Sequence, residues 1–172
     1  MKHLLLILLP LVVACGCDKD DGRYAVGDIY KHNGKTGIVV SVSKNGLHGK
    51  IISTDYVECQ WSVEEEELIV TGAVDWDNGK NNMKVIRSID GWRDKYPAFA
   101  WCADKGKDWY LPAFNELLVV KDARIWMSSA RFYTSTEDET GIGYARTTDM
   151  RTGGYHASKK SVPCFVRAMA TF

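Results

Sequence analysis

The stretch that decides the fold is Lys107–Leu117, which reads KDWYLPAFNEL. Its apolar run, Trp109–Leu111, ends at Pro112. A helix is expected from that proline, because proline is tolerated in the first helical turn. Glu116 suits the same turn, since the positive end of a helix dipole favours a carboxylate. We therefore expect the aromatic run to be buried where a strand meets a helix, with Glu116 capping the helix or pairing locally.

Outward from this stretch, the chain reads as strands, then helices, then strands. The clearest hairpin joins residues 37–43 to residues 47–53 through Asn45-Gly46, a strong turn signal. The other expected elements are helices at 82–88, at 98–105 and from Pro112, and strands at 132–136, 144–150, 155–159 and 162–170. Strands and helices do not alternate, so the predicted class is α+β with an antiparallel sheet.

The composition is that of an ordinary globular domain. Of the 172 residues, 45% are apolar and 26% are charged, and 22 basic residues balance 22 acidic ones. A disordered chain would be less apolar and less balanced in charge. A protein that binds nucleic acid through bulk positive charge would be basic. Both classes are therefore excluded, and the length favours one domain.

The N-terminus predicts export and a lipid anchor. Residues 1–14 read MKHLLLILLPLVVA, a short positive start and an apolar run too short to span a bilayer. Val12–Cys15 resembles a bacterial lipobox, in which the cysteine is acylated; Cys17 is the competing site. We expect a signal peptide at 1–14, lipidation at Cys15 and a tether at 15–26. The acidic start of the tether resembles the surface-export signal of Bacteroidota lipoproteins, so outer-membrane anchoring is expected.

Several segments together resemble one family of domains. Lys107–Leu117 resembles its signature, Trp-Tyr-Leu-Pro followed by Glu-Leu. The other matching segments are 37–53, Trp61-Ser62, Trp101–Ala103, Tyr133–Glu137 and Cys164–Met169. Residues 27–172 are similar to the Lcl C-terminal-like domain and the related Fibrobacter major paralogous domain. The resemblance implies one C-type-lectin-like domain, with two helices packed on twisted antiparallel sheets and with its termini close together.

The resemblance implies no catalytic residues, and it implies use in secreted and surface proteins, some of them adhesin-like. One departure is Tyr133-Thr134, where the family often has Tyr-Trp. The sequence has no zinc-protease, nucleophile-elbow or phosphate-loop motif. The formylglycine-generating enzymes share the broader fold and use cysteines, but no adjacent reactive pair is visible here. We therefore predict that the protein is not an enzyme.

Four cysteines remain once one is lipidated, and an exported protein can oxidise them. Three pairings of four thiols exist. We expect Cys102 to pair with Cys164, because each lies in an apolar segment; free buried thiols are the alternative. No histidine stands at ligand spacing from a cysteine pair, so no zinc site is expected. Arg167, in the closing apolar strand, should find a partner, and Glu116 is one candidate.

The loop Asp75–Asn82 is a candidate calcium site. Alternating Asp and Asn oxygens around a glycine can wrap a hard cation. The candidate ligands are Asp75, Asp77, Asn81 and Asn82. The spacing is not that of an EF-hand, and a hydrogen-bonded polar loop is the alternative. Trp76, in the same loop, either stacks on a sugar ring or packs inward.

The loop Glu137–Gly143 is a second candidate site. It falls where a lectin-like fold carries its variable ligand loop, and Glu137 and Asp138 are its candidate ligand-binding residues. A solvated acidic loop is the alternative. We predict a surface or periplasmic lipoprotein whose domain recognises a glycan or a cell-surface protein. The other candidate is a structural or assembly subunit of a cell-surface complex.

Overall fold

The computed structural model describes residues 22–123, 125 and 131–172. The predicted signal peptide at 1–14, the lipidation site Cys15, the competing Cys17 and the first part of the tether lie outside the described residues. No helix in the described part of the chain is long and apolar enough to cross a membrane.

The described residues form two sheets and four α-helices. The strands are β1 Ile29–His32, β2 Lys35–Val42, β3 Gly49–Ile52, β4 Val57–Cys59, β5 Arg131–Glu137, β6 Tyr144–Asp149, β7 Tyr155–Lys159, β8 Cys164–Val166 and β9 Met169–Thr171. The helices are α1 Gly79–Arg87, α2 Trp92–Lys95, α3 Pro97–Asp104 and α4 Phe114–Asp122, with a 3-10 turn, η1, at Glu64–Glu66. The predicted α+β class is therefore confirmed.

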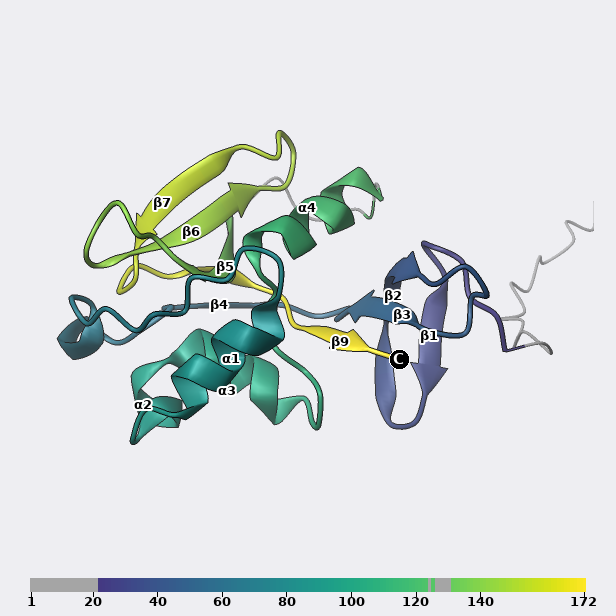
Figure 1. The fold of residues 1–172 in the computed structure, drawn as a ribbon, viewed down its shortest axis with the longest axis horizontal. Coiled ribbons are helices and arrows are strands. Elements are labelled where there is room, and N and C mark those ends of the chain that lie inside the picture. Colours follow the sequence, from purple (N-terminus) through teal and green to yellow (C-terminus); the bar gives the residue numbers. More distant parts are fainter. Residues whose placement is uncertain (1–21, 124, 126–130) are drawn as a thin grey trace, which may run out of the picture.

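The two sheets lie end to end along the long axis of the molecule (Figure 1). The smaller sheet has the order β1-β2-β3-β9 and the larger β4-β8-β5-β6-β7. All neighbours are antiparallel except β5 and β8, which run parallel. Helices α1, α2 and α3 lie together on one side of the larger sheet, and α4 contacts β2, β5 and β6. α4 therefore bridges the two sheets.

Two expectations about the elements need correction. Four helices are present in the described residues, whereas the resemblance implied two and the sequence pattern three: the helix expected at 82–88 is α1, which begins at Gly79, and the single-turn α2 was not expected. The strand expected at 162–170 is divided into β8 and β9, which belong to different sheets. The division falls at Arg167-Ala168, where the Ala168 carbonyl accepts a hydrogen bond from Ser53 and the Arg167 guanidinium donates to Thr54.

The segment Lys107–Leu117 lies where the two sheets and α4 meet. Trp109, Tyr110 and Leu111 are 4%, 2% and 0% exposed. Tyr110 exchanges two backbone hydrogen bonds of 2.9 Å with Met169 of β9, so the run joins the smaller sheet before α4 begins. The expected burial at a strand–helix junction is confirmed.

A glycine is required where α1 approaches this junction. A Cβ on Gly79 would lie 2.3 Å from the Leu111 carbonyl oxygen, far inside van der Waals contact. The Gly79 amide donates instead to the Glu116 carboxylate, at 3.0 Å. The start of α1 is thereby fixed against the start of α4.

Candidate functional site

The start of α1, the start of α4 and the β6–β7 hairpin meet around one arginine. The Arg146 guanidinium of β6 lies 3.8 Å from the ring centroid of Trp76 and 4.5 Å from that of Tyr155 on β7. Arg146 is only 6% exposed, whereas Trp76 is half-buried and Tyr155 is 43% exposed. A cation held between two aromatic faces is attracted to both of them. The two rings therefore form a pre-ordered aromatic surface.

Asp138 completes this group, which we call the Trp76 cluster: Trp76, Asp138, Arg146 and Tyr155. Its Oδ1 lies 3.5 Å from Arg146 Nη2 and accepts hydrogen bonds from the Thr140 amide and hydroxyl, while its Oδ2 accepts one from the Tyr155 hydroxyl. Burial works to raise the Asp138 pKa, but the bonds from Tyr155 and Thr140 and the charge of Arg146 together hold that pKa below its usual range. Asp138 is therefore an ionised, preorganised carboxylate beside the aromatic surface.

Glu137, the other predicted ligand-binding residue of this loop, does not belong to the cluster. It is 3% exposed and accepts hydrogen bonds from the amides of Thr71 and Gly72 and from the Thr71 hydroxyl. It also forms an ion pair with Lys160, which is fully buried. Successive residues at the end of a strand point to opposite faces. Glu137 therefore points into the core, and its role is structural.

The predicted calcium ligands are satisfied within their own loop. Asp75 Oδ1 accepts the amides of Asp77 and Asn78, both at 2.9 Å, and its Oδ2 accepts Asn81 Nδ2 at 2.7 Å. These hydrogen bonds lower the Asp75 pKa, and the bond from Asn81 has the largest effect. Asn82 is 1% exposed, and its amide group bonds the Asp75 backbone in both directions. The side-chain oxygens of Asp75 and Asn82 therefore accept hydrogen bonds from within the loop and its helix.

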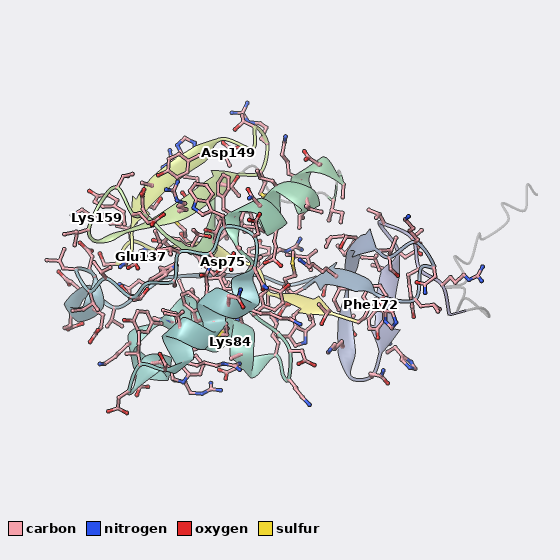
Figure 2. The ribbon with its side chains drawn as sticks, viewed as in Figure 1. Asp75, Lys84, Glu137, Asp149, Lys159 and Phe172 are labelled. Carbon is pink, nitrogen blue, oxygen red and sulfur yellow. The ribbon has the colours of Figure 1, made fainter. Side chains whose placement is uncertain are left out.

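This donor set does not fit a cation. Asn82 is removed by burial, and Asp77 Oδ1 is taken by Asn115 Nδ2 at 2.7 Å. Over the described residues, no group of three or more His, Cys, Asp or Glu side chains is placed to hold a metal ion. The loop instead caps α1, with the Asn78 side chain accepting the Lys80 amide. Figure 2 shows Asp75 near the centre of the molecule, at the start of that helix, and Glu137 nearer one end.

Glu116 accepts four hydrogen bonds at the start of α4, near the cluster. Its Oε1 accepts Lys50 Nζ at 2.7 Å and the Tyr110 hydroxyl at 2.9 Å. Its Oε2 accepts the amides of Gly79 and Ala113, at 3.0 and 2.9 Å. The expected local role at the start of α4 is confirmed, and the same carboxylate also ties α4 to β3 and α1.

The suggested pairing of Glu116 with Arg167 is wrong. Arg167 Nη2 donates to the Thr54 carbonyl at 2.8 Å, and its Nε and Nη1 have no hydrogen-bond partner among the described residues. Burial lowers the Arg167 pKa. The charge that balances Glu116 is Lys50, whose position in β3 gave no sequence signal for this contact.

A small cavity continues the Trp76 cluster toward the smaller sheet. Its volume is about 180 Å³, and Lys50, Asp77, Asn115 and Glu116 supply its polar lining. The backbone amide of Asn115, which lines the cavity, donates a hydrogen bond to the Trp76 carbonyl at 2.9 Å, so the cavity lies next to the cluster. The volume of the cavity is below that usual for a small-molecule pocket, so the cluster and not the cavity is the candidate binding surface.

The three described cysteines are free thiols. The predicted Cys102–Cys164 bond is not formed; Cys164 on β8 stands directly opposite Cys59 on β4. Burial and the neighbouring Cys164 raise the Cys59 pKa to about 11. Apolar context showed that these segments enter the core, but it could not show which strands pair. The thiols are therefore held protonated, as structural residues are.

Sequence analysis missed Arg146 and Tyr155, the two residues that join Trp76 to Asp138. One signal was present: an arginine within a strand that is otherwise buried requires a partner.

Comparison of the chain with protein-family models and with curated proteins gives no match.

Proposed function

We propose that the chain is a lipid-anchored recognition protein, exposed on a cell surface or in the periplasm, which binds a glycan or a cell-surface protein without transforming it. The observation that carries the proposal is the Trp76 cluster. Two aromatic rings are fixed at the surface by one arginine, and an ionised carboxylate lies beside them. Tryptophan, tyrosine and arginine are the residues that dominate binding energies at interfaces.

Preorganisation makes this cluster suited to binding. The Arg146 guanidinium and the Asp138 hydrogen bonds hold the rings of Trp76 and Tyr155 in place before a ligand arrives. Phe114 supports both rings from below, with ring centroids 5.4 Å from Trp76 and 6.0 Å from Tyr155. A site that is already ordered loses less entropy on binding. The proposed ligand surface needs no rearrangement.

The proposed fold is C-type-lectin-like. It is supported by the two largely antiparallel sheets and by the meeting of the two ends of the described chain, where the Phe172 ring lies 4.6 Å from that of Tyr30 and 5.3 Å from that of Tyr24. The described chain therefore begins and ends on one side of the domain, next to the proposed tether. The proposed anchor is Cys15, and its support is the lipobox sequence.

The test is binding of the full chain, in nonionic detergent, to a glycan array and to intact cells, with Trp76→Ala and Tyr155→Ala beside the wild type. Each variant is expected to lower affinity at least about tenfold, which corresponds to about 1.4 kcal/mol. The matched control is Tyr56→Ala, which removes a 56%-exposed tyrosine elsewhere. Binding unchanged by both cluster variants contradicts the proposal. Signal on the array identifies a glycan, and signal on cells alone identifies a protein.

A second candidate function, assembly into a cell-surface complex, is favoured by a different observation. Five aliphatic side chains stand exposed at one end of the molecule: Leu68, Ile69, Val70, Ile142 and Val162. The Gly143 and Leu68 segments touch, and Lys160 bonds the carbonyl of Ile69, so these residues share one surface. Clustered exposed apolar side chains mark protein–protein contacts.

A further inference from the structure

A groove between α1 and the segment before α4 collects positive charge. Its volume is about 300 Å³, and its lining includes Lys80, Lys84 and Arg87 of α1 and Lys107. Its base is formed by three apolar side chains that are nearly buried: Met83, Trp109 and Tyr110. The lysines and the arginine of α1 recur every three or four residues, so they share one helical face about 10 Å long. Figure 2 shows Lys84 on α1.

These four cations are not neutralised within the described residues. No carboxylate there forms an ion pair with Lys80, Lys84, Arg87 or Lys107. Lys80 donates to the Thr171 hydroxyl, a neutral partner. Asp108, the one acid that lines the groove, pairs with Lys35 at 3.3 Å. The whole chain has equal numbers of acidic and basic residues, so the groove carries a local excess of positive charge. This excess is available to bind an acidic ligand.

The complementary feature is the segment Glu64–Val70, which reads EEEELIV. Glu64 and Glu65 are exposed and have no ion-pair partner in the described chain, whereas Glu66 pairs with Lys95. Leu68 and Val70 are each 68% exposed. The segment therefore presents unpaired carboxylates, the charge that complements a basic groove, beside exposed aliphatic side chains.

We infer that the groove binds the Glu64–Val70 segment of a second copy of this chain. The contact would set Glu64 and Glu65 of one copy against Lys84 and Arg87 of the next. Groove and segment lie on different parts of the molecule, η1 at one end of the long axis and α1 near its middle (Figure 1). Because the two surfaces differ, a pair joined by one such contact keeps one free groove and one free segment, so further copies can add to an open chain or close into a ring.

The burial of the aromatic side chains in the groove favours this occupant over a single-stranded nucleic acid. Binding of single strands relies on exposed aromatic faces on which bases stack. Trp109 and Tyr110 are 4% and 2% exposed, so neither offers a face. The inference is independent of the Trp76 cluster and supplies a partner for the assembly function, so its failure leaves the recognition proposal standing.

The first measurement is sedimentation of the full chain in nonionic detergent over a range of concentrations. The mean mass of the wild type is expected to rise with concentration at low salt. It should fall back toward the monomer at about 0.5 M NaCl, because salt screens exposed charges. A mass that stays monomeric at all concentrations and at low salt overturns the inference.

A charge exchange makes the test specific. K84E/R87E reverses the charge of the groove, and E64K/E65K reverses the charge of the segment. Each variant alone is expected to weaken association at least about tenfold, because like charges would then face each other. Mixing the two variants should restore association, since each groove again meets a segment of opposite sign. The chain that carries all four substitutions should associate with itself. Failure of both restorations overturns the inference.

The matched control is K31E/K44E, which changes the net charge equally at two exposed lysines. It is expected to associate as the wild type does. Circular dichroism and thermal melting check that each variant is folded, and their substituted residues are all exposed. If K31E/K44E weakens association as much as K84E/R87E, net charge and not the groove controls it, and the inference fails. Association of the wild type that requires added oligonucleotide overturns it in favour of nucleic acid.

Discussion

Glu137 and Asp138 are neighbours in sequence and both meet a cation, yet they serve different purposes. Glu137 pairs with Lys160 inside the core, where both side chains are almost completely buried. Asp138 lies beside Arg146 between two aromatic rings, one of which is 43% exposed. The first pair holds the loop at 69–72 onto the sheet, whereas the second orders a surface. The Asp138–Arg146 pair is itself buried, with side chains 1% and 8% exposed, so what it offers a ligand is the two rings that it holds in place.

The largest expected effect comes from Glu137→Gln. It would leave the Lys160 ammonium in the core without its counter-charge, and removal of one partner of a buried pair costs about 3–5 kcal/mol. The free energy of unfolding, measured by urea denaturation, should fall by that amount. The matched control, Glu139→Gln, changes an exposed carboxylate two residues away and should stay within about 0.5 kcal/mol of the wild type.

The double variant Glu137→Gln with Lys160→Met sharpens this result. Removing both charges should cost less than removing one, because no uncompensated ion is left in the core. A double variant less stable than Glu137→Gln alone would show that the pair is not the source of the effect.

A smaller, pH-dependent effect is expected for Asp138→Asn. At pH 7 the loss should be about 1–3 kcal/mol, the usual cost of removing one partner from a buried hydrogen-bonded group. The folded-state pKa of Asp138 is lowered, so its contribution is fully present above the unfolded value of about 3.9 and is lost as pH falls through the folded pKa. The difference between wild type and variant, followed by urea denaturation from pH 7 to pH 2, should therefore shrink toward acid. A constant difference would contradict the assignment.

Tyr155→Phe should have a still smaller effect on stability. It removes one hydrogen bond to the ionised Asp138 Oδ2 and keeps the ring over Arg146; the cost should be about 1.5 kcal/mol, the low end for a bond to a charged group, because Tyr155 is 43% exposed. Because that bond helps to lower the Asp138 pKa, the acid loss of stability should move to higher pH. Tyr56→Phe serves as the control, since the Tyr56 hydroxyl has no hydrogen-bond partner in the described residues. If the loss of stability at acid pH occurs at the same pH in Tyr155→Phe as in the wild type, the Tyr155 hydroxyl does not lower the Asp138 pKa.

The same comparison shows how far sequence reasoning reached. The α+β class, the β2–β3 hairpin and the burial of Trp109–Leu111 followed from local patterns, because turn residues and apolar runs act over a few residues. The two acids of the 137–143 loop could not be told apart in this way. Which one faces the core depends on the register of β5, and Lys160 reaches Glu137 from a distant part of the chain.

Pairing between distant segments accounts for the other errors. Cys164 stands opposite Cys59 because β4 and β8 are neighbours, and strand order across a sheet is not encoded in the composition of either strand. Glu116 meets Lys50 because α4 bridges the two sheets. Arg146 was the residue within reach of sequence reasoning, since a buried strand arginine demands a partner.

The smallest expected effect is that of calcium on the Asp75 loop, where no stabilisation is predicted. A ligand that binds only the folded state raises its stability, by about 2.7 kcal/mol at a hundred times its dissociation constant. The Asp75 carboxylate already accepts three hydrogen bonds and Asn82 is buried, so a cation would have to break the cap of α1 to bind. The thermal midpoint with millimolar Ca²⁺ and with a chelator should agree within about 1 °C, which is below the shift that 1 kcal/mol produces in a domain of this size. A clear rise that Asp75→Ala abolishes would show that the Asp75 carboxylate is open to a cation, unlike the buried carboxylates of Glu137 and Asp138.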